Sequence, residues 1–129
     1  PLFNRGEMRR DFTYIDDIAE AVVRLIGRPP LGKPDWDAGR ADPSTSSAPW
    51  KIYNIGNSRP EELTHVVSVL ESEFGRVAEK EMLPMQPGDV EATYADVADL
   101  QRDIGFRPIT TIEDGIARFA KWYREFHRL

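Results

Sequence analysis

Two arginines stand close to the start of the chain, Arg9 and Arg10, within the segment RRDFTYIDDI. A guanidinium presents a rigid fork of donors that fits phosphate oxygens, and it keeps its charge when water is removed. Arg10 is therefore a candidate for binding a doubly negative group such as a pyrophosphate. The alternative is that Arg10 pairs with an acid nearby in the sequence: Asp11, Asp16 or Asp17.

A second candidate is the segment MQPGDVEATYAD, residues 85–96. Pro87 and Gly88 favour a turn whose backbone amides can face a ligand. Asp89 follows directly, and an ionised carboxylate is a natural acceptor for the hydroxyls of a ribose. The alternative is an ordinary turn that carries a surface acid.

The chain contains no complete active site. No glycine triplet has the spacing that brings a backbone against a dinucleotide pyrophosphate, and no tyrosine is followed four residues later by lysine. His65 and His127 have no carboxylate or cysteine pattern beside them, and the serines of residues 44–47 lie outside any G-x-S-x-G elbow. The sequence therefore predicts no catalytic residue and no metal site.

Composition narrows the class of protein. The 129 residues carry a net charge of -5, which argues against nonspecific nucleic-acid binding. No apolar run has the ~18 residues of a membrane span, and the absence of cysteine fits a cytoplasmic protein. We expect one α/β domain over residues 1–129. Because the chain begins at Pro1, we also expect it to be a piece of a longer protein.

Apolar spacing predicts four helices: at about 17–26, before Gly75, before Gly105 and at the end of the chain. Capping boxes at Asp17/Glu20, Ser58/Glu61 and Thr110/Glu113 should begin three of them, and Asp96 should cap the other. Short strands are expected at 1–4, 10–15 and 51–57, with a weaker one at 77–83. The proline-rich stretch 28–50 is predicted to be a long loop, functional or partly mobile.

Four segments in order, MRRDFTYIDDIAEAVVRL, TSSAPWKIYNIGN, MLPMQPGDVEATYADV and DIGFRP, resemble the C-terminal third of nucleotide-sugar epimerases. These enzymes belong to the extended short-chain dehydrogenase/reductase superfamily. RDFTYIDD is shared by many of its members. SSAP and YNIGN together with MLPMQPGDV point to the UDP-glucuronate 4-epimerases.

The resemblance implies roles for five residues in binding a UDP-sugar. Arg10 would contact the diphosphate, and Asp89 would accept the ribose hydroxyls. Phe3 would lie at the uracil site, and Thr93 would border the sugar. Gln86 stands where many relatives have a second phosphate-binding arginine, so it offers a hydrogen bond without the charge.

The resemblance also implies an α/β fold that forms the C-terminal portion of an NAD-dependent epimerase/dehydratase. An N-terminal Rossmann domain, absent from these residues, would bind NAD, carry the Tyr-x-x-x-Lys pair and be the partner of this chain. The full-length enzyme, a possible homodimer, would be an isomerase of carbohydrate metabolism. It would interconvert UDP-glucuronate and UDP-galacturonate through a 4-keto intermediate.

Two other readings stay open from the sequence. One is a nucleotide-sugar dehydratase or decarboxylase of the same superfamily, which residues around the Tyr-Lys pair would distinguish. The other is a non-catalytic nucleotide-binding or interaction module, which the absence of an upstream Rossmann-coding frame would favour. In every case, we expect the isolated chain to be inactive and to bind no cofactor by itself.

Overall fold

The computed structural model describes all 129 residues, which form helices and a small sheet. In chain order the elements are a 3-10 turn η1 (Phe3–Gly6), β1 (Arg9–Asp11), α1 (Ile15–Ile26), β2 (Pro60–Glu62), α2 (Leu63–Phe74), α3 (Ala98–Ile104) and α4 (Ile112–His127). The four predicted α-helices are present, but there are two strands instead of about four. None of the helices is long and apolar enough to cross a membrane.

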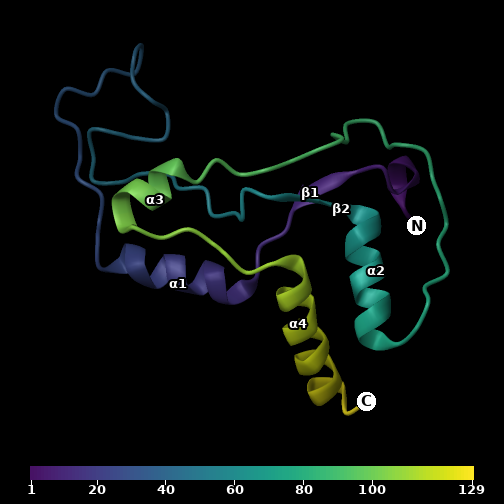
Figure 1. The fold of residues 1–129 in the computed structure, drawn as a ribbon. Helices are drawn as coiled ribbons and strands as arrows, with labels where there is room; N and C mark the ends of the chain where they lie inside the picture. The colour runs from purple at the N-terminus through teal and green to yellow at the C-terminus, as the bar shows by residue number, and fades with distance from the viewer.

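The helices form two packed pairs, α1 with α3 and α2 with α4, and the sheet lies beside α2 (Figure 1). The first pair encloses a small core of Ala21, Val97, Leu100 and Ile104. The second pair buries Val66, Ile116 and Ala120. Only 14 of 129 residues are buried, so much of the apolar surface of the chain stays exposed.

Strand β1 is bordered on both sides. Its register with the antiparallel β2 pairs Arg10 with Glu61. On the other side, Arg9 forms a parallel bridge with Ala92, and Leu2 forms a second parallel bridge with Met82. Residues 81–93 therefore run alongside residues 2–9, although about 80 positions separate them in the sequence.

Several helix ends follow the sequence signals. Gly75 and Gly105 end α2 and α3 with φ of 64° and 66°, where a side chain would be strained. The carboxylate of Asp96 accepts a hydrogen bond from the amide of Ala98 at the start of α3. The final helix is capped one residue later than predicted, because Thr111 rather than Thr110 is its N-cap residue.

The other two capping boxes were wrong, because distant segments bind the side chains involved. Asp17 lies within α1, which begins at Ile15, and its carboxylate accepts a hydrogen bond from the amide of Thr110. Ser58 donates to the carbonyl oxygen of Ala95, and residues 60–62 form β2 rather than a first helical turn.

The predicted strands at 1–4, 51–57 and 77–83 were also wrong. Each contributes a single bridging residue, respectively Leu2, Lys51 and Met82, because a strand needs a neighbour along its whole length. The predicted strand 10–15 is shorter and earlier, at residues 9–11, because Ile15 already belongs to α1. The stretch 28–50 contains no helix or named strand, as expected for a loop.

Candidate functional site

The guanidinium of half-buried Arg10 is held by backbone oxygens. Its Nη1 atom donates to the carbonyl oxygen of Arg9 at 2.8 Å and to that of Glu91 at 3.2 Å. Its Nη2 atom lies 3.9 Å from the sulfur of Met8. Neutral carbonyls fix the orientation of the guanidinium while leaving its charge available for an anion.

The alternative role for Arg10, pairing with a nearby acid, is not realised. The carboxylate of Asp11 accepts hydrogen bonds from backbone amides, and that of Asp17 accepts one from Thr110. Asp16 lies 3.8 Å from Arg118 on α4. Arg9 is exposed and donates to the carbonyl oxygen of Pro60.

Asp89 lies at the end of a tight turn. Its amide donates to the carbonyl oxygen of Gln86 at 3.2 Å, and Gly88 has a φ of 89°. With Pro87 at the second position, this is the pattern of a type II turn. The structure shows no partner within the chain for the Asp89 carboxylate, which is therefore free to accept hydrogen bonds from a ligand. Gln86 is exposed.

Phe3 and Thr93 lie on the two segments that run side by side. Phe3 is half-buried in η1, next to Leu2, whose amide donates to the carbonyl oxygen of Glu81 at 2.7 Å. Thr93 is exposed, and its amide donates to the carbonyl oxygen of Arg9 at 3.2 Å.

Thr93 also lines a hollow of about 300 Å³ beside β1. Its walls come from three segments of the chain and contain the residues Asp11, Thr13, Asn54, Ile55, Gly56, Thr93, Tyr94 and Ala95. The hydroxyls and the amide of this set are able to bond sugar hydroxyls, whereas the carboxylate of Asp11 already accepts hydrogen bonds from three backbone amides.

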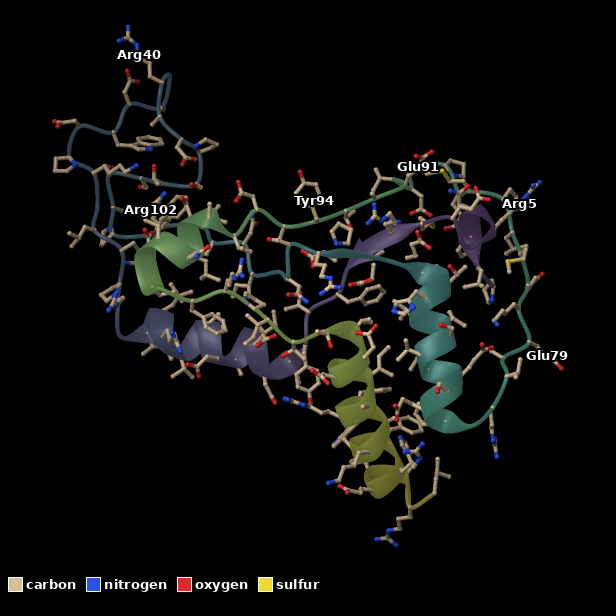
Figure 2. The ribbon with its side chains drawn as sticks, in the orientation of Figure 1. Arg5, Arg40, Glu79, Glu91, Tyr94 and Arg102 are labelled. Carbon is tan, nitrogen blue, oxygen red and sulfur yellow. The ribbon has the colours of Figure 1, made fainter.

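The structure thus brings the five predicted residues onto two neighbouring segments, 3–10 and 86–93. Figure 2 shows Arg5 and Glu91 at the η1 end of this region, and Tyr94 farther along the same extended segment. No side-chain hydrogen bond or ion pair joins any two of the five residues. Glu91 was missed by the sequence reasoning, because a backbone carbonyl that holds an arginine leaves no signal in residue type.

Comparison with known proteins tests the resemblance. No family model matches the chain. Protein CapI of Staphylococcus aureus is 47% identical over 127 residues, covering 98% of this chain and 38% of CapI. A probable UDP-glucuronate 4-epimerase of Rhizobium meliloti is 41% identical, covering 98% of this chain and 38% of that protein. The chain is homologous to part of the UDP-glucuronate 4-epimerases. It spans well under half the length of these relatives.

Solved structures agree on the fold of this chain. A variant of UDP-glucuronic acid 4-epimerase from Bacillus cereus has a TM-score of 0.71 at 23% identity, over 96% of this chain and 34% of that one. UDP-glucose 4-epimerase from Bifidobacterium longum has a TM-score of 0.70 at 21% identity, over 95% of this chain and 34% of that one. The predicted fold, a portion of the extended short-chain dehydrogenase/reductase fold, is confirmed.

Proposed function

We propose that this chain is the C-terminal, UDP-sugar-binding portion of an NAD-dependent epimerase that interconverts UDP-glucuronate and UDP-galacturonate. The observation that carries the proposal is the guanidinium of Arg10, which is oriented by two carbonyl oxygens and neutralised by no carboxylate. The homology to UDP-glucuronate 4-epimerases supplies the class of anion, a nucleoside diphosphate.

The proposed site grips the nucleotide end of the substrate. Arg10 binds the diphosphate, and Gln86 adds an uncharged donor at the neighbouring turn. Asp89 accepts the ribose hydroxyls, and Phe3 borders the uracil. Thr93, which lines the hollow beside β1, limits the space for the sugar.

This division suits epimerisation through a 4-keto sugar. The oxidised sugar has to turn over without leaving, so the affinity of the enzyme should reside in the nucleotide and phosphates. Binding energy from such non-reacting parts retains the intermediate while the ring stays free to move. Arg10 and Asp89 are then anchors that position the substrate and transfer no proton.

The residues of this chain do not fit NAD. Strand β2 leads into α2 with no residue between them, and β1 leads into α1 through Phe12-Thr13-Tyr14, which contains no glycine. The helix that follows, α1, carries Asp16 and Asp17 in its first turn, and these acids would repel a pyrophosphate. We therefore assign NAD and the proton-transfer pair to a Rossmann domain elsewhere in the enzyme.

A face of α1 fits contact with that domain. Its side chains recur at helical spacing and are all exposed: Ile15, Ala19, Val22, Val23 and Ile26. Val23 and Ile26 are 63% and 77% exposed. Exposed apolar side chains gathered on one helix face are typical of a contact surface. The relatives are more than twice as long as this chain, so they have additional residues to cover such a face. A full-length enzyme would work in the cytoplasm, either alone or as a homodimer.

Calorimetric titration with UDP, UDP-glucuronate and free glucuronate tests the proposed function. We expect UDP and UDP-glucuronate to bind with similar affinity and glucuronate not to bind, because the contacts lie on the nucleotide. The chain with added NAD should form no UDP-galacturonate. Tighter binding of free glucuronate than of UDP, or turnover by the chain alone, would contradict the proposal.

A further inference from the structure

The carboxylate of Asp11 accepts three backbone hydrogen bonds. Its Oδ1 atom accepts from the amide of Asn57 at 3.0 Å, and its Oδ2 atom accepts from the amides of Ser58 and Ala95, each at 3.0 Å. The donors are 46, 47 and 84 positions away in the sequence. One side chain at the end of β1 therefore joins this strand to two other segments, residues 57–58 and the segment that contains Ala95.

Gly56 makes room for this arrangement. A Cβ atom at position 56 would lie 2.7 Å from Oδ2 of Asp11 and 2.4 Å from the Cβ of Ala95. Both separations are shorter than real Cβ contacts, so any larger residue would displace the carboxylate or residue 95. Gly56 is buried, and its φ is not positive. A glycine is needed here because there is no room for a side chain.

Asp11 also completes the attachment of segment 91–95 to β1. The backbone of Arg9 binds this segment twice, through its amide to Glu91 and through its carbonyl oxygen to Thr93. Those bonds fix one end, and the bond from Ala95 to Asp11 fixes the other. Thr93 belongs to the first attachment, two residues before Ala95, and Asp89 lies just before both attachments.

We propose that Asp11 is a positioning residue for the nucleotide-sugar site. Its carboxylate holds Thr93 and Asp89 at their working distance from Arg10. This inference rests on the proposed function of the same site. Asp11 itself binds backbone amides, and its effect on the substrate is exerted through residues 89–95. A carboxylate is required because both of its oxygens only accept, whereas an asparagine amide would turn a donor towards other donors.

The test compares two ligands on Asp11→Asn. Inorganic pyrophosphate lacks the ribose, so it needs the charge of Arg10 and the neutral donor of Gln86 but not Asp89, whereas UDP needs all three residues. We expect UDP affinity to fall about tenfold to a hundredfold, the range for losing one charge-assisted hydrogen bond. Pyrophosphate affinity should change less than twofold. Equal losses for the two ligands, or no loss, would overturn the positioning role.

Gly56→Ala perturbs the same contacts by crowding the carboxylate and Ala95 while leaving the chemistry of Asp11 unchanged. It should lower UDP affinity and spare pyrophosphate affinity, as Asp11→Asn does. Hydrogen exchange at the Ala95 amide supplies a ligand-free readout, which should become faster in both variants. Unchanged exchange at Ala95 would also overturn the proposal. If the unaltered chain bound pyrophosphate but not UDP, the proposed function and the positioning role would fail together. If the unaltered chain bound UDP but the variants did not show the expected loss of UDP affinity, only the role of Asp11 would be overturned.

Discussion

Replacing Lys51 with methionine should loosen the contact between the segment that follows the long loop and α3. The side chain of Lys51 is only 11% exposed, and its Nζ atom lies 2.7 Å from Oδ2 of Asp103 and 2.9 Å from Oδ2 of Asp99. Tyr53 donates a further hydrogen bond to Asp103 at 2.8 Å. These polar contacts lie against the core that contains Leu100.

The loss of stability in Lys51→Met can be estimated from these contacts. Lys51→Met removes two charge-assisted hydrogen bonds and leaves the two neighbouring carboxylates with Arg102 as their remaining cationic partner. Each such bond is worth about 1.5–3 kcal/mol. Because the side chains of Asp99 and Asp103 are 36% and 27% exposed, water replaces part of the interaction. We expect a loss of about 2 kcal/mol in the free energy of unfolding at pH 7.

The stabilisation that Lys51 contributes should change with pH in a defined direction. The hydrogen bond from Lys51 lowers the pKa of Asp103 and that of Asp99 below the usual 3.8. The stabilisation is therefore complete above pH 3.8 and is lost as the pH falls through the lowered values. Burial alone would lower the pKa of Lys51, but the bonds to Asp103 and Asp99 outweigh it and raise that pKa above 10.5. The contribution of Lys51 consequently persists up to pH 10.5.

Urea unfolding of Lys51→Met beside Lys121→Met measures the effect. Lys121 is exposed and belongs to no ion pair, so it controls for the loss of a lysine charge. A loss of about 2 kcal/mol lowers the urea midpoint by about 1 M. An equal midpoint for the two variants at pH 7 would refute the reasoning. So would a difference between them that stayed the same at pH 2.

Two further substitutions test the turn and the exposed face. Gly88→Ala and Gly75→Ala both place a side chain at positive φ with open space around it. Each should destabilise the chain by about 1 kcal/mol, yet only Gly88→Ala should weaken UDP binding, which calorimetry will show. Val23→Asp on the outer face of α1 should reduce the binding of a hydrophobic dye without lowering the urea midpoint, because Val23 is 63% exposed. A large drop in that midpoint would show that the face packs inside this chain.

Local signals predicted the parts of the fold that depend on neighbouring residues. Gly75 and Gly105 end their helices as expected, because a left-handed residue is a property of the backbone at that position. Asp17 and Ser58 were wrongly read as caps, because Thr110 and Ala95 bind them across the fold. No local pattern shows such a partner.

The candidate site followed the same pattern, and the roles of its residues stay predictions. Arg10 and Asp89 were identified by residue type beside a strand and a turn, and the structure leaves the charged groups of both without an ionic partner. The hydrogen bonds made by Asp11 were missed, because its three donors are 46 to 84 positions away. Only the fold brings them together.

Calorimetric titration of the chain with UDP, comparing Arg10→Ala with Arg9→Ala, tests the central claim most directly. Both variants lose one arginine from the same strand, so they have equal net charge, but Arg10 alone is oriented by the carbonyl oxygen of Glu91. We predict that Arg10→Ala weakens UDP binding at least tenfold and that Arg9→Ala changes it less than twofold. Equal effects of the two substitutions would contradict a diphosphate site at Arg10.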